Sequence, residues 1–330
     1  MKMKVVITDY VAPPAEFEER VLANVADVIC LQQTDETGLE GKIEDADGLI
    51  VFHTITLSSR SIDRLTKCKV ISRCGVGFDN VDLAAAGSKG IYVCNVPDYG
   101  VDEVADHAIA LTLSCSRGLS FTEKQLRKTL KPWNYLAVPK LHRLAGSTFG
   151  VIGLGRIGTA TAMRAKALRM DVVACDPYIP DGRDKALGVT MVPLDELVTV
   201  SDVVSVHTPL TEETRGIVGK QQIAKMKHHA ILINTARGEC VDVDALAQAL
   251  EEGKIGGAGL DVLPVEPPET QRRIIELWQQ DDPPVNLVIT PHSAFYSEEG
   301  KEEMRTKAAL QVKRVLLGEK PRNVVNEESL

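Results

Sequence analysis

The feature that most constrains this chain of 330 residues is a regular alternation of short apolar runs with segments of helix-forming composition. Strands that are separated by helices favour parallel βαβ units over an antiparallel sandwich or a helical bundle. We therefore predict an α/β protein built on doubly wound parallel sheets. The chain is also long for one core, so two domains are expected.

The apolar runs fall into two groups, with a boundary near Pro97. The first group predicts five strands and two of the helices between them: strands at 5–8, 28–31, 48–53, 70–73 and 91–96, helices at 15–24 and 82–89. The second predicts six strands, the number expected of a complete dinucleotide-binding sheet: 149–153, 171–175, 203–207, 230–234, 257–262 and 287–290.

Two further segments are expected to be helices. Residues 101–117 are apolar nearly all round in their second half, so this helix should be buried between domains or between subunits. Residues 297–317 follow the last strand and could return to the first group, which would make that domain discontinuous.

A glycine motif, GLGRIG at 153–158, follows an apolar strand and opens a helical segment. Gly153 permits a tight turn, Gly155 lets the backbone approach a pyrophosphate, and Gly158 lets the helix pack closely on the strand. The free N–H groups at the start of the helix, around Arg156 and Ile157, would face the phosphates. The strand–turn–helix context makes a dinucleotide site the favoured interpretation over a glycine turn used for packing alone.

Asp176 strengthens this interpretation, because it ends the next predicted strand eighteen residues after Gly158. A carboxylate there accepts hydrogen bonds from the adenosine ribose and repels a 2′-phosphate. The residues that follow, Pro177, Tyr178 and Ile179, offer no arginine to receive such a phosphate. NAD(H) is therefore predicted in preference to NADP(H).

Three polar residues follow the predicted ends of neighbouring strands: Arg237 in NTARGE, Glu266 in GAGLDVLPVEP and His292 in ITPHSAF. Ligands of open parallel sheets bind beyond the carboxyl ends of the strands. Singly, these residues could be a surface cation, a loop charge and a helix cap. Together they suit reduction of a carbonyl beside a carboxylate: arginine binds the carboxylate, histidine donates a proton, and glutamate orients the imidazole and favours its charged form.

The amino-acid composition limits the kinds of partner and cofactor that this protein is expected to bind. The 38 Lys and Arg against 46 Asp and Glu give a net charge of −8, which offers no overall attraction to nucleic acid or to anionic membranes. No secretion signal and no apolar run of ~18 residues is present. The seven cysteines form no CxxC pair and no HExxH motif occurs, so reduced thiols and no metal are expected. We expect a cytoplasmic protein.

On these residues the chain resembles the D-isomer-specific 2-hydroxyacid dehydrogenases, through GLGRIG, Asp176, NTARG at 234–238, GAGLDV at 257–262, Glu266 and TPH at 290–292. Within that family it is most similar to the C-terminal-binding proteins, which are dehydrogenase-like corepressors. The shorter strings that carry this likeness are HTITL at 53–57, GFDNVD at 77–82, NVP at 95–97, DPY at 176–178 and SAFYSE at 293–298.

The resemblance implies a homodimer with a flavodoxin-like substrate domain (1–98 plus 297–330), a Rossmann NAD-binding domain (99–296) and a cleft between them. It implies catalytic roles for Arg237, Glu266 and His292, and a substrate carboxylate held at Val76 and Gly77. Arg73 would face the substrate, and Phe295 stands where the C-terminal-binding proteins carry a tryptophan of the substrate pocket. The further cofactor contacts that it implies are Thr208, Pro209, Thr214, Thr235, Ala236, Asp261 and His292.

The leading hypothesis is thus an NAD-dependent D-2-hydroxyacid dehydrogenase. An NAD(H)-sensing scaffold with a vestigial site is the alternative from another class, and a phosphite or phosphorylated keto-acid substrate is a third. The separation of Glu266 from His292 is longer than the resemblance leads us to expect, so the polar stretch 269–284 is predicted to form a longer surface loop.

Overall fold

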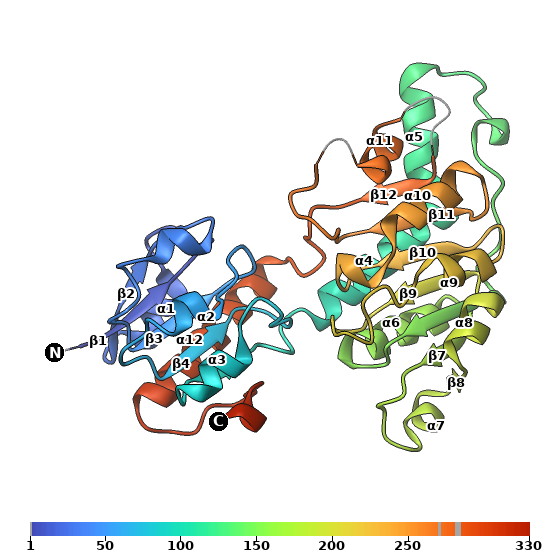
Figure 1. The fold of residues 1–330 in the computed structure, drawn as a ribbon. Coiled ribbons are helices and arrows are strands. Elements are labelled where there is room, and N and C mark those ends of the chain that lie inside the picture. Colours follow the sequence, from blue (N-terminus) through green and yellow to red (C-terminus); the bar gives the residue numbers. More distant parts are fainter. Residues whose placement is uncertain (1, 270–271, 281–284) are drawn as a thin grey trace. The chain divides into compact units, whose positions relative to one another are not determined.

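The computed structural model describes residues 2–269, 272–280 and 285–330. The chain divides into two compact units, one formed by Met1–Gly100 with Ser297–Leu330 and the other by Val101–Tyr296. Each unit is a parallel sheet with helices packed against it (Figure 1). The predicted α/β class with two parallel sheets is confirmed. Among the described helices, none has the length and hydrophobicity to cross a bilayer.

The first unit has a five-stranded parallel sheet in the order β2-β1-β3-β4-β5, which is the flavodoxin-like order. Its strands are β1 (Met3–Ile7), β2 (Ala26–Cys30), β3 (Gly48–Val51), β4 (Val70–Arg73) and β5 (Tyr92–Cys94). Its helices are α1 (Glu16–Leu22), α2 (Ser59–Ile62), α3 (Leu83–Ser88), α12 (Glu298–Leu316) and the 3-10 turns η1 (Glu36–Leu39) and η4 (Glu327–Ser329).

The C-terminal helix α12 packs against α1, β3 and β4 of this unit. Arg305 of α12 donates two hydrogen bonds, of 2.8 and 2.6 Å, to the fully buried carboxylate of Glu18 in α1. A buried carboxylate requires such a partner. The expected return of the last helix to the first group of strands is therefore seen, with an ion pair that joins the two ends of the chain.

The second unit has seven parallel strands in the order β12-β11-β10-β9-β6-β7-β8, which is the Rossmann order with one added strand. They are β6 (Thr148–Ile152), β7 (Asp171–Cys175), β8 (Thr190–Met191), β9 (Val203–Val206), β10 (Ile231–Asn234), β11 (Gly257–Leu260) and β12 (Leu287–Ile289). The helices are α4 (Val101–Ser116), α5 (Leu119–Lys128), α6 (Arg156–Ala167), α7 (Arg183–Leu187), α8 (Leu194–Val200), α9 (Lys220–Lys225), α10 (Val243–Glu251), α11 (Arg273–Gln279), and the 3-10 turns η2 (Tyr135–Ala137) and η3 (Gly238–Cys240).

Two expectations about this unit were wrong. The sheet has seven strands and not six, because β8 is an edge strand of only two residues and carries no alternating pattern. The stretch 269–284 is not simply a loop, since it contains α11, which buries Ile274, Ile275 and Leu277. Residues 270–271 and 281–284 of that stretch lie outside the described part.

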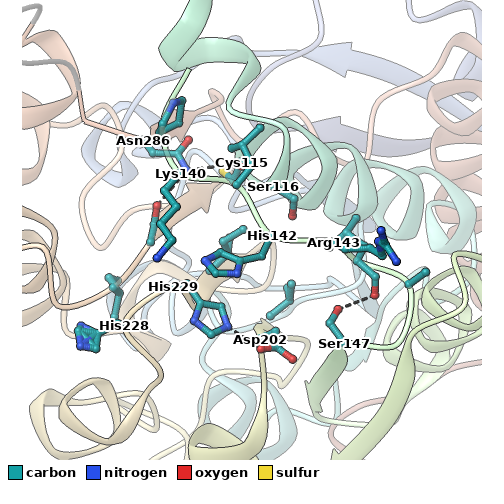
Figure 2. A pocket seen from close by; sticks show the side chains of 18 of the residues that line it. Cys115, Ser116, Lys140, His142, Arg143, Ser147, Asp202, His228, His229 and Asn286 are labelled. Atoms are coloured by element: carbon teal, nitrogen blue, oxygen red, sulfur yellow. Dashed lines mark hydrogen bonds and ion pairs between the residues drawn. The ribbon is translucent and has the colours of Figure 1, made fainter. Parts of the chain in front are cut away.

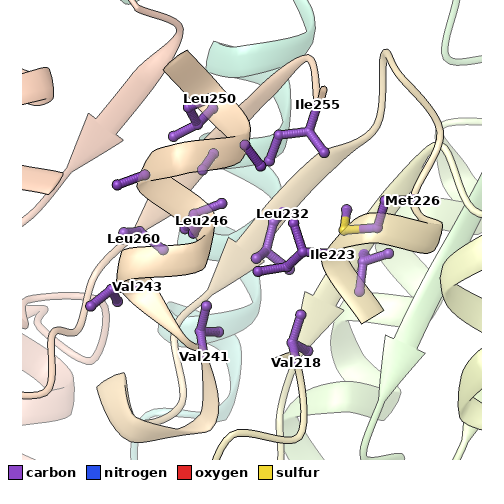
Figure 3. Close-up of a cluster of buried hydrophobic side chains, with 14 of the residues drawn as sticks. Val218, Ile223, Met226, Leu232, Val241, Val243, Leu246, Leu250, Ile255 and Leu260 are labelled. Carbon is purple, nitrogen blue, oxygen red and sulfur yellow. The ribbon is translucent and has the colours of Figure 1, made fainter. Parts of the chain in front are cut away.

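The core beneath β10 and β11 fixes the strands that lead to the candidate site (Figure 3). Helix α10 begins where the Asp242 side chain accepts a hydrogen bond from the Ala245 amide, and Figure 3 shows its Leu246 beside Leu232 and Leu260 of the sheet. Replacing one such buried leucine by alanine costs about 2–5 kcal/mol. The ends of β10 and β11 are therefore held firmly.

Candidate active site

The glycine turn between β6 and α6 has the geometry of a phosphate cradle. Gly153 has a φ of +90°, which favours glycine, and a Cβ on Gly158 would lie 2.0 Å from the Gly153 carbonyl oxygen. Gly155 differs, because a Cβ there would meet nothing within 4 Å. It caps α6 without a side-chain hydrogen bond to the first amides of the helix, those of Arg156 and Ile157. Such amides bind anions.

Asp176 lies beside this turn, immediately after β7. One of its carboxylate oxygens accepts a hydrogen bond of 2.7 Å from the Leu154 amide, and the other accepts one of 2.9 Å from the Tyr178 amide. These bonds orient the carboxylate next to the phosphate cradle, and each oxygen keeps lone pairs for further donors. This is the arrangement that a ribose diol requires.

The chain that follows β9 completes the surroundings of the turn. A Cβ on Gly153 would lie 2.8 Å from the His207 carbonyl oxygen and 3.0 Å from the Thr208 methyl group, so Thr208 is adjacent to the turn. The Thr214 hydroxyl donates a hydrogen bond of 2.6 Å to the carbonyl of Pro209, which closes the 209–214 loop on itself.

Thr235, directly after β10, has a buried hydroxyl without a hydrogen-bond partner among the described residues. Its neighbour Ala236 is fixed by a bond from its amide to the Asn234 side chain, of 3.0 Å. A buried hydroxyl that lacks a partner is costly and calls for one. The open cradle, the oriented Asp176 and this hydroxyl all fit a dinucleotide.

Glu266 and His292 are brought together although they are far apart in the sequence. The Nδ1 atom of His292 lies 2.6 Å from Oε2 of Glu266, and the other carboxylate oxygen accepts a hydrogen bond of 2.9 Å from the Leu263 amide. The side chain of His292 is 24% exposed and that of Glu266 is 33% exposed, so the pair is accessible to a substrate.

Arg237 approaches the same loop because of the glycine that follows it. A Cβ on Gly238 would lie 2.0 Å from the carbonyl carbon of Leu263, so only glycine permits this contact between the segments after β10 and β11. The Arg237 side chain is partly exposed, and its Nη1 donates to the Ala236 carbonyl at 2.8 Å. The guanidinium is thus anchored at one nitrogen.

Asp261 accepts hydrogen bonds from residues on both sides of His292. Its buried carboxylate accepts hydrogen bonds of 2.6 Å from the Thr290 hydroxyl and of 2.9 Å from each of the Ser293 and Ala294 amides. His292 itself has a φ of +51°, unusual for a residue other than glycine, and its amide donates to the Asp261 carbonyl at 2.8 Å. A strained backbone persists only where its surroundings fix it, and Asp261 supplies that support.

The sequence did not reveal this network. Asp261 was identified only as a cofactor contact, and His107 of α4 was not connected with the site, although its Nε2 lies 2.9 Å from the Thr290 hydroxyl. The available signal was an aspartate placed directly after one strand beside a TPH sequence after the next. The ring of Phe295 meets that of His292 edge-on, with 6.3 Å between centroids.

In the first unit, the turn 74–77 follows β4. Its carbonyls are held by Asn95, which donates to Val76 at 2.6 Å, and by the Val96 amide, which donates to Gly75 at 2.9 Å. The Arg73 side chain is buried, and its Nη1 donates to the Cys74 carbonyl at 3.1 Å. Gly75 has a φ of +143°, and a Cβ there would strike that guanidinium.

Arg73 therefore serves the turn in this structure, and its predicted contact with substrate stays a prediction. The Cys74 thiol beside it is buried, and burial raises its pKa well above the ordinary value. A thiol in that state is not a nucleophile at neutral pH.

Comparison with known proteins identifies the family to which the chain belongs. The family model described as "D-isomer specific 2-hydroxyacid dehydrogenase, NAD binding domain" matches residues 109–294. The chain belongs to the D-isomer specific 2-hydroxyacid dehydrogenase family. Members of this family are NAD-dependent oxidoreductases, so the predicted enzyme class and the predicted cofactor, NAD(H), are confirmed.

Relatives cover nearly the whole chain. A D-3-phosphoglycerate dehydrogenase of Methanocaldococcus jannaschii is 40% identical over 98% of this chain, which spans 59% of that relative's length. A glyoxylate reductase of Korarchaeum cryptofilum is 36% identical over 87% of this chain and 85% of its own. The structure of a D-lactate dehydrogenase from Aquifex aeolicus, complexed with NAD and lactic acid, superposes with a TM-score of 0.85 at 31% identity, covering 99% of this 2-hydroxyacid dehydrogenase and 97% of that chain.

Proposed function

We propose that this dehydrogenase interconverts a 2-keto acid and a D-2-hydroxy acid, with Arg237 as the carboxylate ligand, His292 as the proton donor and Glu266 as the partner of His292. The contact of 2.6 Å between His292 Nδ1 and Glu266 Oε2 carries this proposal. With Nδ1 engaged by Glu266, Nε2 is the nitrogen that can hand a proton to substrate.

When bound, NADH supplies the hydride to the carbonyl carbon. The negative charge that develops on the carbonyl oxygen is neutralised by the proton on His292 Nε2, which leaves the imidazole neutral. Glu266 orients the imidazole, because its Oε2 lies 2.6 Å from Nδ1 and so leaves Nε2 turned to the substrate. Arg237 offers a planar pair of N–H groups to the substrate carboxylate, which fixes the keto carbon.

The cofactor contacts proposed here extend beyond the glycine turn. Gly153, Gly155 and Gly158, with the amides of Arg156 and Ile157, would hold the pyrophosphate, and Asp176 the adenosine ribose. The residues proposed toward the nicotinamide half are Thr208, Pro209, Thr214, Thr235, Ala236, Asp261 and His292. The unpaired hydroxyl of Thr235 and the open space at Gly155 support this set.

For the substrate we propose amide donors at Val76 and Gly77 and an aromatic wall at Phe295. The support is the turn 74–77, which is held rigidly by Asn95 and Arg73, and the edge contact of Phe295 with His292. On this basis residues 1–98 with 297–330 are the substrate domain, and 99–296 bind NAD.

We also propose a homodimer. Five large apolar side chains are exposed on the segment 119–136 of the second unit: Leu119, Leu130, Trp133, Tyr135 and Leu136. A cluster of exposed apolar side chains of this size typically marks a protein interface.

The names of the relatives suggest which keto acids to try first. NADH oxidation is followed with glyoxylate, pyruvate, hydroxypyruvate and 3-phosphohydroxypyruvate, together with branched and thioether 2-keto acids. We expect clear preference for one of them, and every chiral product (all but the glycolate formed from glyoxylate) should be the D-isomer when resolved on a chiral column. Tight NADH binding without turnover of any of these acids would contradict the proposal and favour the scaffold function of the C-terminal-binding proteins.

A further inference from the structure

A cavity lies in the second unit, away from the candidate active site described above. It has a volume of about 730 Å³, and it opens at the edge of the sheet where the strands begin (Figure 2). Its wall includes Val203 and Ile231, the first residues of β9 and β10, and Asn286, directly before β12. Arg237 and His292 follow the other ends of β10 and β12. Since β10 has four residues at about 3.3 Å each, the two edges are about 13 Å apart.

Basic side chains from two segments line this cavity. Lys140, His142 and Arg143 come from the segment between η2 and β6, and His228 and His229 come from the turn between α9 and β10. Figure 2 shows the rings of His142 and His229 stacked at its centre, with 4.3 Å between centroids, and Lys140 beside them.

The one carboxylate among the lining residues is already neutralised. Asp202 accepts hydrogen bonds of 2.9 Å from Lys227 and 2.7 Å from His229 at one oxygen, and of 2.7 Å from the Thr148 amide at the other. In the described part of the chain, neither Lys140 nor Arg143 forms an ion pair with a carboxylate. The cavity therefore keeps two positive charges without a partner, before any protonation of its histidines.

Metal binding does not account for these histidines. The described residues contain no group of three or more His, Cys, Asp or Glu side chains arranged to hold a metal ion. The stacked rings of His142 and His229 face each other rather than a common point.

We propose that this cavity is a binding site for a small organic phosphate, distinct from the NAD and keto-acid site. The charges of Lys140 and Arg143, which are both exposed side chains, match that of a phosphate monoester, and the imidazoles of His142 and His228 add N–H donors within the same wall. The volume exceeds what inorganic phosphate needs and lies within the range of ~300–1,000 Å³ typical of small-molecule sites. Apolar side chains of Leu141, Leu144 and Ile255 supply contacts for the organic part.

The test is calorimetric titration of the whole protein with glycerol 3-phosphate, which has no keto or carboxylate group, and with inorganic phosphate. Saturating NADH is present, because the glycine turn is the competing phosphate site. We expect one site per chain, tighter binding of glycerol 3-phosphate than of phosphate, and no binding of glycerol. The double variant Lys140→Ala/Arg143→Ala should lose at least tenfold in affinity and keep the wild-type affinity for NADH.

The matched control is Lys220→Ala/Lys225→Ala, which removes the same charge from α9 outside the cavity and should bind glycerol 3-phosphate like the wild type. Melting temperatures of both variants establish that they fold. The proposal is overturned by absence of binding at millimolar concentration, by equal affinity in the cavity variant, or by binding that NADH abolishes. These readouts do not depend on turnover of a keto acid.

Discussion

The substitution Gly155→Ala should weaken NADH binding in this dehydrogenase without a large change in the stability of the apoprotein. Gly155 has a φ of −69°, which alanine adopts freely, and its Cβ would meet no atom within 4 Å. Alanine lowers the conformational entropy of the unfolded chain, which stabilises the folded protein by about 0.4–1 kcal/mol. Alanine is also a poorer N-cap than glycine, which costs a similar amount of folding free energy. The free energy of unfolding without cofactor should therefore change by less than about 1 kcal/mol.

NADH binding should suffer, because the new methyl group occupies the space through which the pyrophosphate reaches the amides of α6. A hydrogen bond to a charged group contributes about 1.5–3 kcal/mol, so loss of one weakens binding by roughly 10–100-fold. Fluorescence titration of NADH gives the Kd, and thermal melting of the apoprotein gives the stability.

Two other glycines provide the controls. Gly158→Ala should destabilise the apoprotein itself, since its Cβ would lie 2.0 Å from the Gly153 carbonyl oxygen. Gly219→Ala changes another glycine N-cap with a negative φ, that of α9, and should leave NADH binding unchanged. An NADH Kd within twofold of the wild type for Gly155→Ala would refute the placement of the pyrophosphate.

Three further predictions concern the chemistry, the substrate turn and pH. Glu266→Gln keeps the shape of the side chain and its hydrogen bond from the Leu263 amide but removes the charge beside His292. The kcat for keto-acid reduction should therefore fall about 10- to 100-fold, with the Kd of NADH unchanged. A kcat within threefold of the wild type in steady-state assays would count against a catalytic pair of Glu266 and His292. Asn95→Leu removes the hydrogen bond that holds the turn 74–77, and it should raise KM roughly tenfold for every keto acid alike, because the carboxylate is common to all. The control Asn326→Leu removes a comparable buried amide from the same unit and should lower the melting temperature alone. Equal KM values in the two variants would exclude a positioning role for Asn95. Burial lowers the pKa of His207 to about 4 from 6.5, so the unfolded chain takes up a proton that the folded protein excludes, and the free energy of unfolding should fall by about 1–3 kcal/mol as the pH drops from 6.5 to 4. Urea titrations at several pH values should show this dependence in the wild type and a weaker one in His207→Gln. Equal pH dependence in the two proteins would refute the role of His207.

The sequence predicted the fold well because its signals are local. Runs of Val and Ile mark the buried parallel strands, and the glycine turn identifies the strand with which the dinucleotide-binding sheet begins. The two-residue strand β8 and the short helix α11 were missed because neither is long enough to show periodicity.

The candidate site was predictable in part. Parallel strands bring their carboxyl ends to one edge, so Glu266 and His292 were expected to meet, and they do. The support around them depends on tertiary contacts that no local pattern contains. Asp261 bonds to the Thr290 hydroxyl before His292 and to the Ser293 amide after it, and His292 itself has a left-handed conformation. The guanidinium of Arg73 occupies space that only a glycine at position 75 leaves open.

The assignment of the proton donor is the central claim, and a single-turnover measurement tests it most directly. Enzyme saturated with NADH is mixed in a stopped-flow instrument with the keto acid that the wild type prefers, and the decay of NADH absorbance is followed for the wild type and for His292→Gln. The account predicts hydride transfer slowed by about 10²–10⁴-fold in the variant when both proteins are saturated with NADH. A rate constant for His292→Gln equal to that of the wild type would show that the proton comes from another group.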